Sequence, residues 1–252
     1  MRRRLAQSQA SDGVEMIIAL AATAVSGLAL LLLLLAGPIY RTGFVSLQFA
    51  FGFLQWAAYC GIVAMIVAAV AAGLSYWRGG RKPRLVAIAA FALGLVAFAI
   101  PFQFQQMARR VPPIHDITTD LENPPAFQAV LPLRADAPNP VERSPQIDDM
   151  QRKGYPDIQP VTLPMPRDQV FDRALAAAQG SNWMIVAADK SAGLIEAVDT
   201  TRWFGFKDDI VVRVTPWGSG TRVDVRSVSR IGRSDIGTNA RRIREYLGRL
   251  HG

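Results

Sequence analysis

Cysteine and histidine are nearly absent from this sequence. Its 252 residues contain one cysteine, Cys60, and two histidines, His115 and His251. A single cysteine excludes an intrachain disulfide, so any folded domain must be held together by its core. No Cys/His cluster has the spacing of a zinc site, and so few histidines give no support for a Ser/His/Asp hydrolase. We therefore expect no metal and no cofactor.

Charge is almost missing from residues 16–108. The charged side chains there are all basic: Arg41, Arg78, Arg81, Lys82 and Arg84. Uncharged runs at about 16–37, 52–76 and 85–104 are each long enough to cross a bilayer as a helix. A signal peptide is the competing interpretation of the first run, but its hydrophobic region usually has only about 7–15 residues. The pattern favours a membrane anchor of three transmembrane helices over residues 16–108.

The basic residues predict how the anchor is oriented. Three arginines follow Met1 and four basic residues lie in 78–84, whereas the loop between the first two runs has only Arg41. The positive-inside rule places residues 1–15 and the second loop in the cytoplasm. We expect a protein of the inner (cytoplasmic) membrane whose C-terminal domain is extracytoplasmic, in the periplasm of a Gram-negative cell. No charged residue lies mid-span, so a transport route is not indicated.

The formal net charge of +8 at first suggests a nucleic-acid partner. Residues 1–108 hold eight basic against two acidic residues, and residues 109–252 hold twenty against eighteen. Most of the excess therefore flanks the membrane runs, where the topology explains it. We expect no nucleic-acid partner.

Residues 109–166, which we call the strap, contain twelve of the sixteen prolines. That density predicts an extended segment with short turns and no regular helix. The strap is also too apolar for a solvated tether, since it includes Ile114, Ile117, Phe127 and Tyr155. We expect parts of it to lie against the domain that follows.

Residues 167–252 carry the pattern of an α+β soluble domain. A helical pattern from Asp168 to Gly180 precedes strand-like runs at 183–188, 194–200, 209–215 and 221–230, and a second helical pattern covers 237–250. The order predicts a mainly four-stranded antiparallel sheet with two helices.

Three stretches of the strap and the soluble domain have a distinctive sequence. They read PPIHDITTDLENPPAF (112–127), FGFKDD (204–209) and SVSRIGRSDIGTNARRI (227–243). Together they resemble the domain-of-unknown-function family 1499, and the apolar runs resemble its membrane-bound proteobacterial type. The resemblance covers about residues 112–250 and brings no established activity. Many members have a cysteine where this chain reads IHDITTD, so the resemblance implies that cysteine-based chemistry is absent here.

The segment 230–244 is the first candidate site. Its glycines permit unusual backbone angles, and its polar side chains can cap the last helix. Amide N–H groups at a helix start attract anions, more so beside arginines. The candidate ligand- or anion-binding residues are Arg230, Arg233, Ser234, Asp235, Asn239 and Arg241. The alternative is a well-capped helix with a solvated basic face.

The segment 204–209 is the secondary candidate, through Phe204, Phe206, Asp208 and Asp209. A carboxylate pair can bind a cation or divide acid and base roles. Adjacent strand residues point to opposite faces, however, so core aromatics and paired aspartates explain the same pattern.

Two functions follow from these candidates. The first is a membrane-anchored extracytoplasmic domain that binds a partner, or an anionic component of the cell envelope, through its basic helix start. The alternative is an enzyme that uses Asp208, Asp209 and Asp235, with or without a divalent cation.

Overall fold

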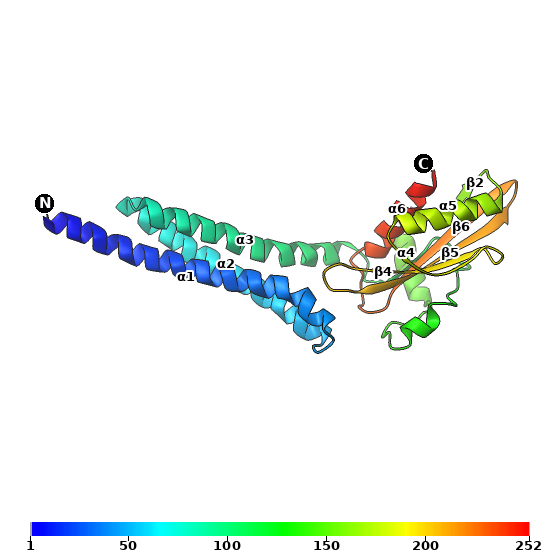
Figure 1. Ribbon diagram of the computed structural model, residues 1–252, viewed down its shortest axis with the longest axis horizontal. Helices are drawn as coiled ribbons and strands as arrows, with labels where there is room; N and C mark the ends of the chain where they lie inside the picture. The colour runs from blue at the N-terminus through cyan, green and yellow to red at the C-terminus, as the bar shows by residue number, and fades with distance from the viewer. Residues whose placement is uncertain (1, 252) are drawn as a thin grey trace. The chain divides into compact units, whose positions relative to one another are not determined.

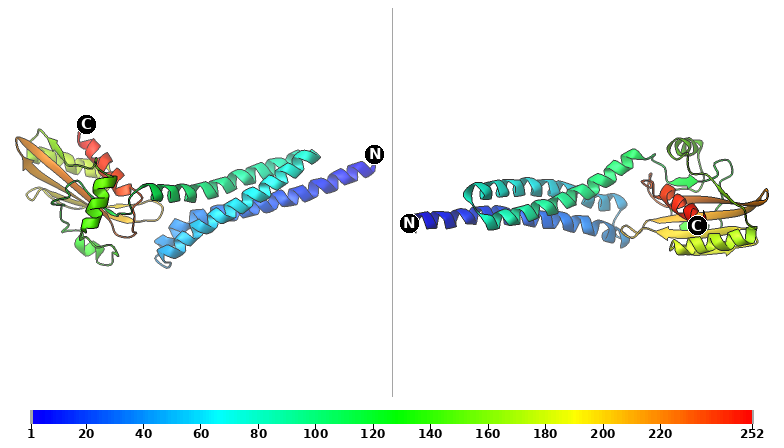
Figure 2. Two further views of the ribbon diagram at one scale, coloured as in Figure 1. Left: turned by 180° about the vertical axis from the view of Figure 1, so that it is seen from behind. Right: turned by 90° about the horizontal axis from the view of Figure 1, so that it is seen from above.

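A computed structural model describes the backbone of residues 2–251 and the side chains of residues 13–251. The chain divides into two compact units, residues 1–106 and 107–252. The first is helical, and the second holds a sheet with helices (Figures 1 and 2). The predicted combination of three long apolar helices and a C-terminal antiparallel sheet domain is confirmed.

The first unit is built from α1 (Arg2–Arg41), α2 (Leu47–Arg78) and α3 (Arg81–Arg110), whose last turn belongs to the second unit. All three are long and apolar enough to cross a membrane. Each helix runs past the uncharged run that predicted it, because flanking polar residues continue the backbone hydrogen bonding. Ser46 caps α2 by accepting from the amide of Phe49. The side chains of residues 2–4, which carry part of the predicted orientation, lie outside the described residues.

Small residues let these helices approach closely. Ala22, Ala68 and Ala90 form one buried cluster that joins α1, α2 and α3. Gly61 and Gly94 face each other where α2 meets α3, and a Cβ added at Gly61 would lie 2.7 Å from the carbonyl oxygen of Gly94. Packing of this kind is how apolar helices associate without a hydrophobic driving force between them.

The sheet of the second unit has six strands, so the prediction of four was wrong. Its order is β1-β6-β5-β4-β3, with β2 also on β6, and every pairing is antiparallel. The strands are β1 (Asp116–Thr118), β2 (Val161–Leu163), β3 (Met184–Asp189), β4 (Leu194–Thr200), β5 (Lys207–Trp217) and β6 (Gly220–Ser229). β1 and β2 come from the strap. Each has three residues, too few to show an alternating pattern in the sequence.

The strap also contains helix, which corrects the prediction of an extended segment without one. It forms the 3₁₀ turn η1 (Leu131–Arg134) and helix α4 (Pro145–Gly154). Pro145 occupies the start of α4, where a missing N–H costs nothing, and no proline interrupts the helix. The two helices predicted for residues 167–252 are α5 (Arg167–Gly180) and α6 (Thr238–His251).

Helices α5 and α6 lie side by side over one face of the sheet (Figures 1 and 2). The hydroxyl of Tyr246 on α6 donates to the carbonyl of Ala174 on α5 at 2.9 Å. The strands present apolar side chains to them, among which Ile195, Ile210 and Val225 are fully buried. This helix-covered face holds the main core.

The strap covers the opposite face. Phe127 and Val130 pack there against Val198, Val211 and Val228. The buried carboxylate of Glu196 accepts the amide N–H groups of Gln128, Ala129 and Val130 at 2.9–3.1 Å. Because β1 and β2 also pair with β6, the strap closes one edge of the sheet as well as one face.

Candidate functional site

The motif 227–243 forms a buried hydrogen-bond network around Asn239. Its side-chain amide donates to the carbonyl of His115 and the hydroxyl of Ser229, both at 3.0 Å, and its oxygen accepts from Ser227 at 2.7 Å. Asn239 is fully buried, because α6 lies directly over the end of β6. This residue therefore joins the strap, β6 and α6.

Arg242 extends the network to two carboxylates. Its guanidinium contacts Asp208 on β5 at 2.5 Å and Asp199 on β4 at 2.8 Å, and it also contacts Ser227 and Asn239. Burial is the largest single influence on the pKa of Arg242 and lowers it, but the attraction and hydrogen bonds of Asp208 and Asp199 together raise this pKa above its usual value. Asp208 is buried and Asp199 is partly exposed, with 32% of its side chain accessible. Asp199 is the solvent-facing end of the network.

Asp209 points to the other face of the sheet. It is completely buried between Arg134 of the strap, at 3.1 Å, and Arg230, at 2.7 Å. Arg230 also donates to the carbonyl of Leu133 at 2.5 Å. The adjacent carboxylates of Asp208 and Asp209 are therefore separated by the sheet, each with its own arginine. This arrangement does not favour the enzyme hypothesis.

The start of α6 is filled by the chain's own carboxylate. Asp235 accepts the amide N–H groups of Gly237 at 2.8 Å and Asn239 at 2.6 Å. Burial raises the pKa of Asp235, and the two amides oppose that shift. Ser234 accepts the amide of Ile236, whose φ of 53° is left-handed. An external anion at the helix start would have to compete with Asp235.

Phe204 and Phe206 stack on each other in the β4–β5 connection, with ring centroids 5.0 Å apart. Gly205 between them has a φ of 71°, a conformation that favours glycine. Phe204 is buried. Phe206 precedes Lys207, whose carbonyl accepts the amide N–H of Arg230 at 3.0 Å, so this connection lies next to the first of the candidate arginines.

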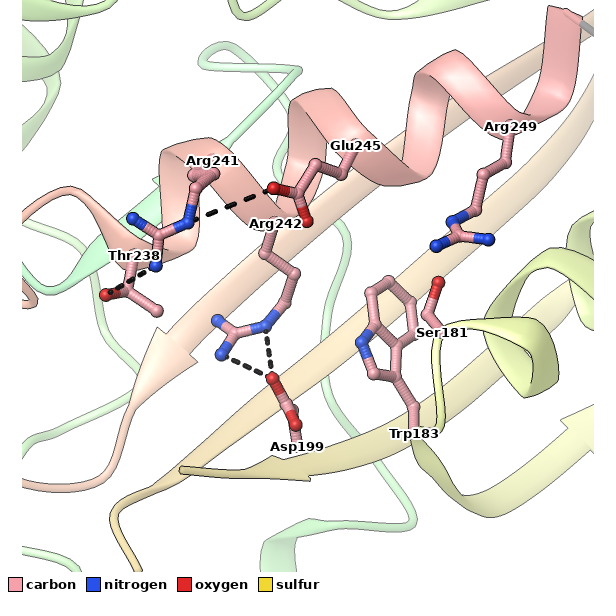
Figure 3. Close-up of a pocket in the computed structure, with 8 residues that line it drawn as sticks. All are labelled: Ser181, Trp183, Asp199, Thr238, Arg241, Arg242, Glu245 and Arg249. Atoms are coloured by element: carbon pink, nitrogen blue, oxygen red, sulfur yellow. Dashed lines mark hydrogen bonds and ion pairs between the residues drawn. The ribbon is translucent and has the colours of Figure 1, made fainter. Parts of the chain in front are cut away.

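A cavity of about 140 Å³ opens between α6, the start of β3 and the end of β4 (Figure 3). α6 contributes the exposed Arg241, Glu245 and Arg249, the half-buried Thr238 and the buried Arg242. The lining residues from elsewhere are Ser181, Trp183 and Asp199. Of the predicted site residues, this cavity contains Arg241.

Trp183 lines the cavity with a largely buried ring that carries one N–H donor. Only 7% of the residue is exposed, and its ring stacks on Tyr246 with centroids 4.9 Å apart. Figure 3 shows its indole nitrogen directed into the space beside Asp199 and Arg242. Within the described residues this N–H has no hydrogen-bond partner. The N–H is not among the fully buried unpartnered atoms of the described residues, so it is open to the cavity and a ligand acceptor can fit there.

The guanidinium of Arg249 faces the same cavity from the last turns of α6 (Figure 3). Arg249 is exposed and forms no ion pair with the described side chains, whereas Arg241 lies 3.9 Å from Glu245. No pattern in the sequence indicated this pair of donors. In the sequence, Trp183 stands at the start of a predicted strand, and Arg249 is one of several arginines in a predicted helix.

The fold and the cavity define a class: an α+β domain that follows three membrane-capable helices and carries a small polar cavity beside its last helix. The family model described as protein of unknown function, DUF1499, matches residues 116–250, more than half of the chain. The chain therefore belongs to this family, as its sequence motifs predicted. Comparison with curated proteins finds no match.

Proposed function

We propose that this protein is a membrane-anchored binding protein whose domain takes an anionic group of an envelope component into the cavity beside α6. The anchor lies in the inner membrane with its N-terminus in the cytoplasm, and the domain is extracytoplasmic. The seven basic residues at 2–4 and 78–84 support this orientation.

The observation that carries the proposal is the unpartnered indole N–H of Trp183, directed into a cavity that Arg249 also faces. An indole N–H can only donate, and a guanidinium presents donors in a planar fork that suits carboxylate or phosphate oxygens. Two such donors around one small space favour an oxyanion.

The proposal keeps the basic C-terminal helix that the sequence indicated and moves the binding position along it. Near the start of α6, Arg230 is ion-paired with Asp209. The amide N–H groups of Gly237 and Asn239 donate to Asp235. Beside α6, the guanidinium of Arg249 and the indole N–H of Trp183 remain available to a ligand. The cavity is small, so it suits a headgroup or a terminal oxyanion rather than a whole large ligand.

The test is a titration of the full chain in detergent micelles with inorganic phosphate, followed by NMR of the ¹⁵N-labelled indole groups. The resonance missing from Trp183→Phe identifies Trp183, and we expect it to shift saturably. Arg249→Gln should weaken binding by about tenfold, because one charge-assisted contact is lost.

Arg233→Gln is the matched control, since Arg233 is an exposed arginine outside the cavity. It should bind phosphate as the native chain does. Weaker phosphate binding by Arg233→Gln, together with native binding by Arg249→Gln, would place the binding site at the start of α6. That result would refute binding in the cavity.

A separate experiment tests the orientation. Alkaline phosphatase fused after Gly252 should be active, because the enzyme folds only outside the cytoplasm. A fluorescent cytoplasmic reporter at the same position should stay dark, and a bright one would reverse the proposed topology.

A further inference from the structure

The charges around the cavity balance. Three guanidinium groups, those of Arg241, Arg242 and Arg249, line it together with the carboxylates of Asp199 and Glu245. Behind Arg242 lies a third carboxylate, that of Asp208, at 2.5 Å. The site as a whole is therefore close to neutral, although charges of both signs face the cavity.

These charges are paired to different extents. Arg242 is fixed between Asp199 and Asp208, so its charge is already compensated. Both contacts of Arg242 with Asp199 use the same carboxylate oxygen, Oδ2. Glu245 has one contact with a cation, Arg241, at the long distance of 3.9 Å, and 66% of its side chain is exposed. Figure 3 shows Glu245 on the α6 side of the cavity and Asp199 on the strand side.

A ligand with only negative charge would meet the donors of Trp183 and Arg249 but would also be repelled by Glu245 and Asp199. A ligand that also carries an ammonium group removes this conflict, because the ammonium can pair with the carboxylates that face the cavity.

Resting on the proposed function, we propose that the ligand is a small zwitterion, with an oxyanion and a primary ammonium group joined by a short chain. The oxyanion accepts from Trp183 and Arg249, and the ammonium donates to Glu245 and the free oxygen of Asp199. A cavity of about 140 Å³ holds groups of this size. The same chemistry occurs in free phosphoethanolamine and in a phosphatidylethanolamine headgroup.

The experiment compares two probes that share a phosphate. Phosphoethanolamine has the ammonium group, and glycerol 3-phosphate has hydroxyl groups in its place. Each is titrated into the full chain in micelles while the Trp183 indole resonance is followed. We expect phosphoethanolamine to bind about tenfold more tightly, the size of one charge-assisted contact.

Glu245→Gln should remove that preference and leave glycerol 3-phosphate binding unchanged. The matched control is Glu122→Gln, since Glu122 is an exposed glutamate outside the cavity. It should keep the preference. Equal affinities for the two probes in the native chain, or a preference that survives Glu245→Gln, would overturn the zwitterion and leave the proposed function standing. No Trp183 shift with any phosphate probe would overturn both.

The two sources are separated with nanodiscs. If the lipid headgroup is the ligand, the chain in phosphatidylethanolamine nanodiscs should already show the shifted Trp183 resonance. Added phosphoethanolamine should then change nothing. If the free compound is the ligand, these nanodiscs should behave like phosphatidylglycerol nanodiscs until phosphoethanolamine is added. Either result supports the zwitterion and identifies its source.

Discussion

On the face of the sheet that α5 and α6 cover, Ile195, Ile210 and Val225 point into an apolar core. On the strap face, the residues next to them in the chain are Glu196, Asp209 and Arg226. All six are at most 6% exposed. The helix-covered face is thus packed mainly with apolar side chains, whereas the strap face also buries charged side chains whose partners the strap supplies.

The difference shows what the strap does. Asp116 of the strap contacts Arg226 at 2.8 Å and Arg143 at 2.7 Å, and Asp120 contacts Arg213 and Arg222. Buried charges are tolerated only when paired. The strap face could not be buried without these partners, so the strap is part of the domain rather than a tether to it.

The largest expected effect comes from breaking a strap-face ion cluster. Asp209→Ala leaves Arg134 and Arg230 without their shared carboxylate, which should lower the free energy of unfolding by about 4 kcal/mol. Urea unfolding of the full chain in micelles, followed by near-UV circular dichroism, measures it. Asp149→Ala, at an exposed ion pair, should change it by less than about 0.5 kcal/mol.

The converse change removes the charges of this cluster altogether. The triple variant Arg134→Met, Asp209→Leu, Arg230→Met replaces the whole cluster with apolar side chains. It should recover most of the stability lost in Asp209→Ala, because no charge is left unpaired. A triple variant no more stable than Asp209→Ala would show that the strap face requires charge in itself.

On the helix-covered face, Ile210→Ala removes a fully buried side chain next to Asp209 in the same strand. We expect a loss of about 3 kcal/mol from lost burial and the remaining cavity. The conservative Ile210→Val should cost about 1 kcal/mol in the same unfolding assay. A graded response of this kind distinguishes a packed face from an ion-paired one.

Glu196→Gln tests the contact between the strap backbone and β4. Glutamine keeps the shape but replaces one acceptor oxygen with an NH₂ group that would face the amides of residues 128–130. The expected loss is about 2 kcal/mol. Hydrogen exchange of those amides should also speed up, and unchanged protection there would contradict the assigned contact.

The smallest effect is a pH dependence from His115. Burial lowers its pKa below 6.5, and Arg134 and Arg143 act in the same direction against Asp116 and the backbone of Arg233. The unfolded chain therefore binds the proton more readily, so the stability contributed above pH 6.5 is lost as the pH falls from 6.5 through the folded pKa. His115→Gln should flatten the unfolding free energy in this window, and an unchanged slope would contradict the shift.

The sequence indicated β3 to β6 because each strand has enough alternating residues, and turn residues separate them. It could not indicate β1 or β2, whose pairing with β6 depends on residues distant in the chain. The contacts of the candidate arginines also depend on residues distant in the chain, so the sequence could not indicate them. Arg230 looked accessible from its neighbours, but β5–β6 pairing brings it to Asp209. Trp183 and Arg249 meet only because α6 crosses the start of β3.

The closure of the sheet edge by the strap has a kinetic consequence. Asp116 and Arg226 are 110 residues apart in the chain, yet they form one buried ion pair. Contacts of such high sequence separation slow folding, because the loop entropy is lost before the contact forms. β1 can pair only after β6 has been synthesised, and β6 is the last strand in chain order. Until then the strap's buried charges lack partners and the β6 edge is absent, so the nascent domain is vulnerable to proteolysis and aggregation throughout its synthesis.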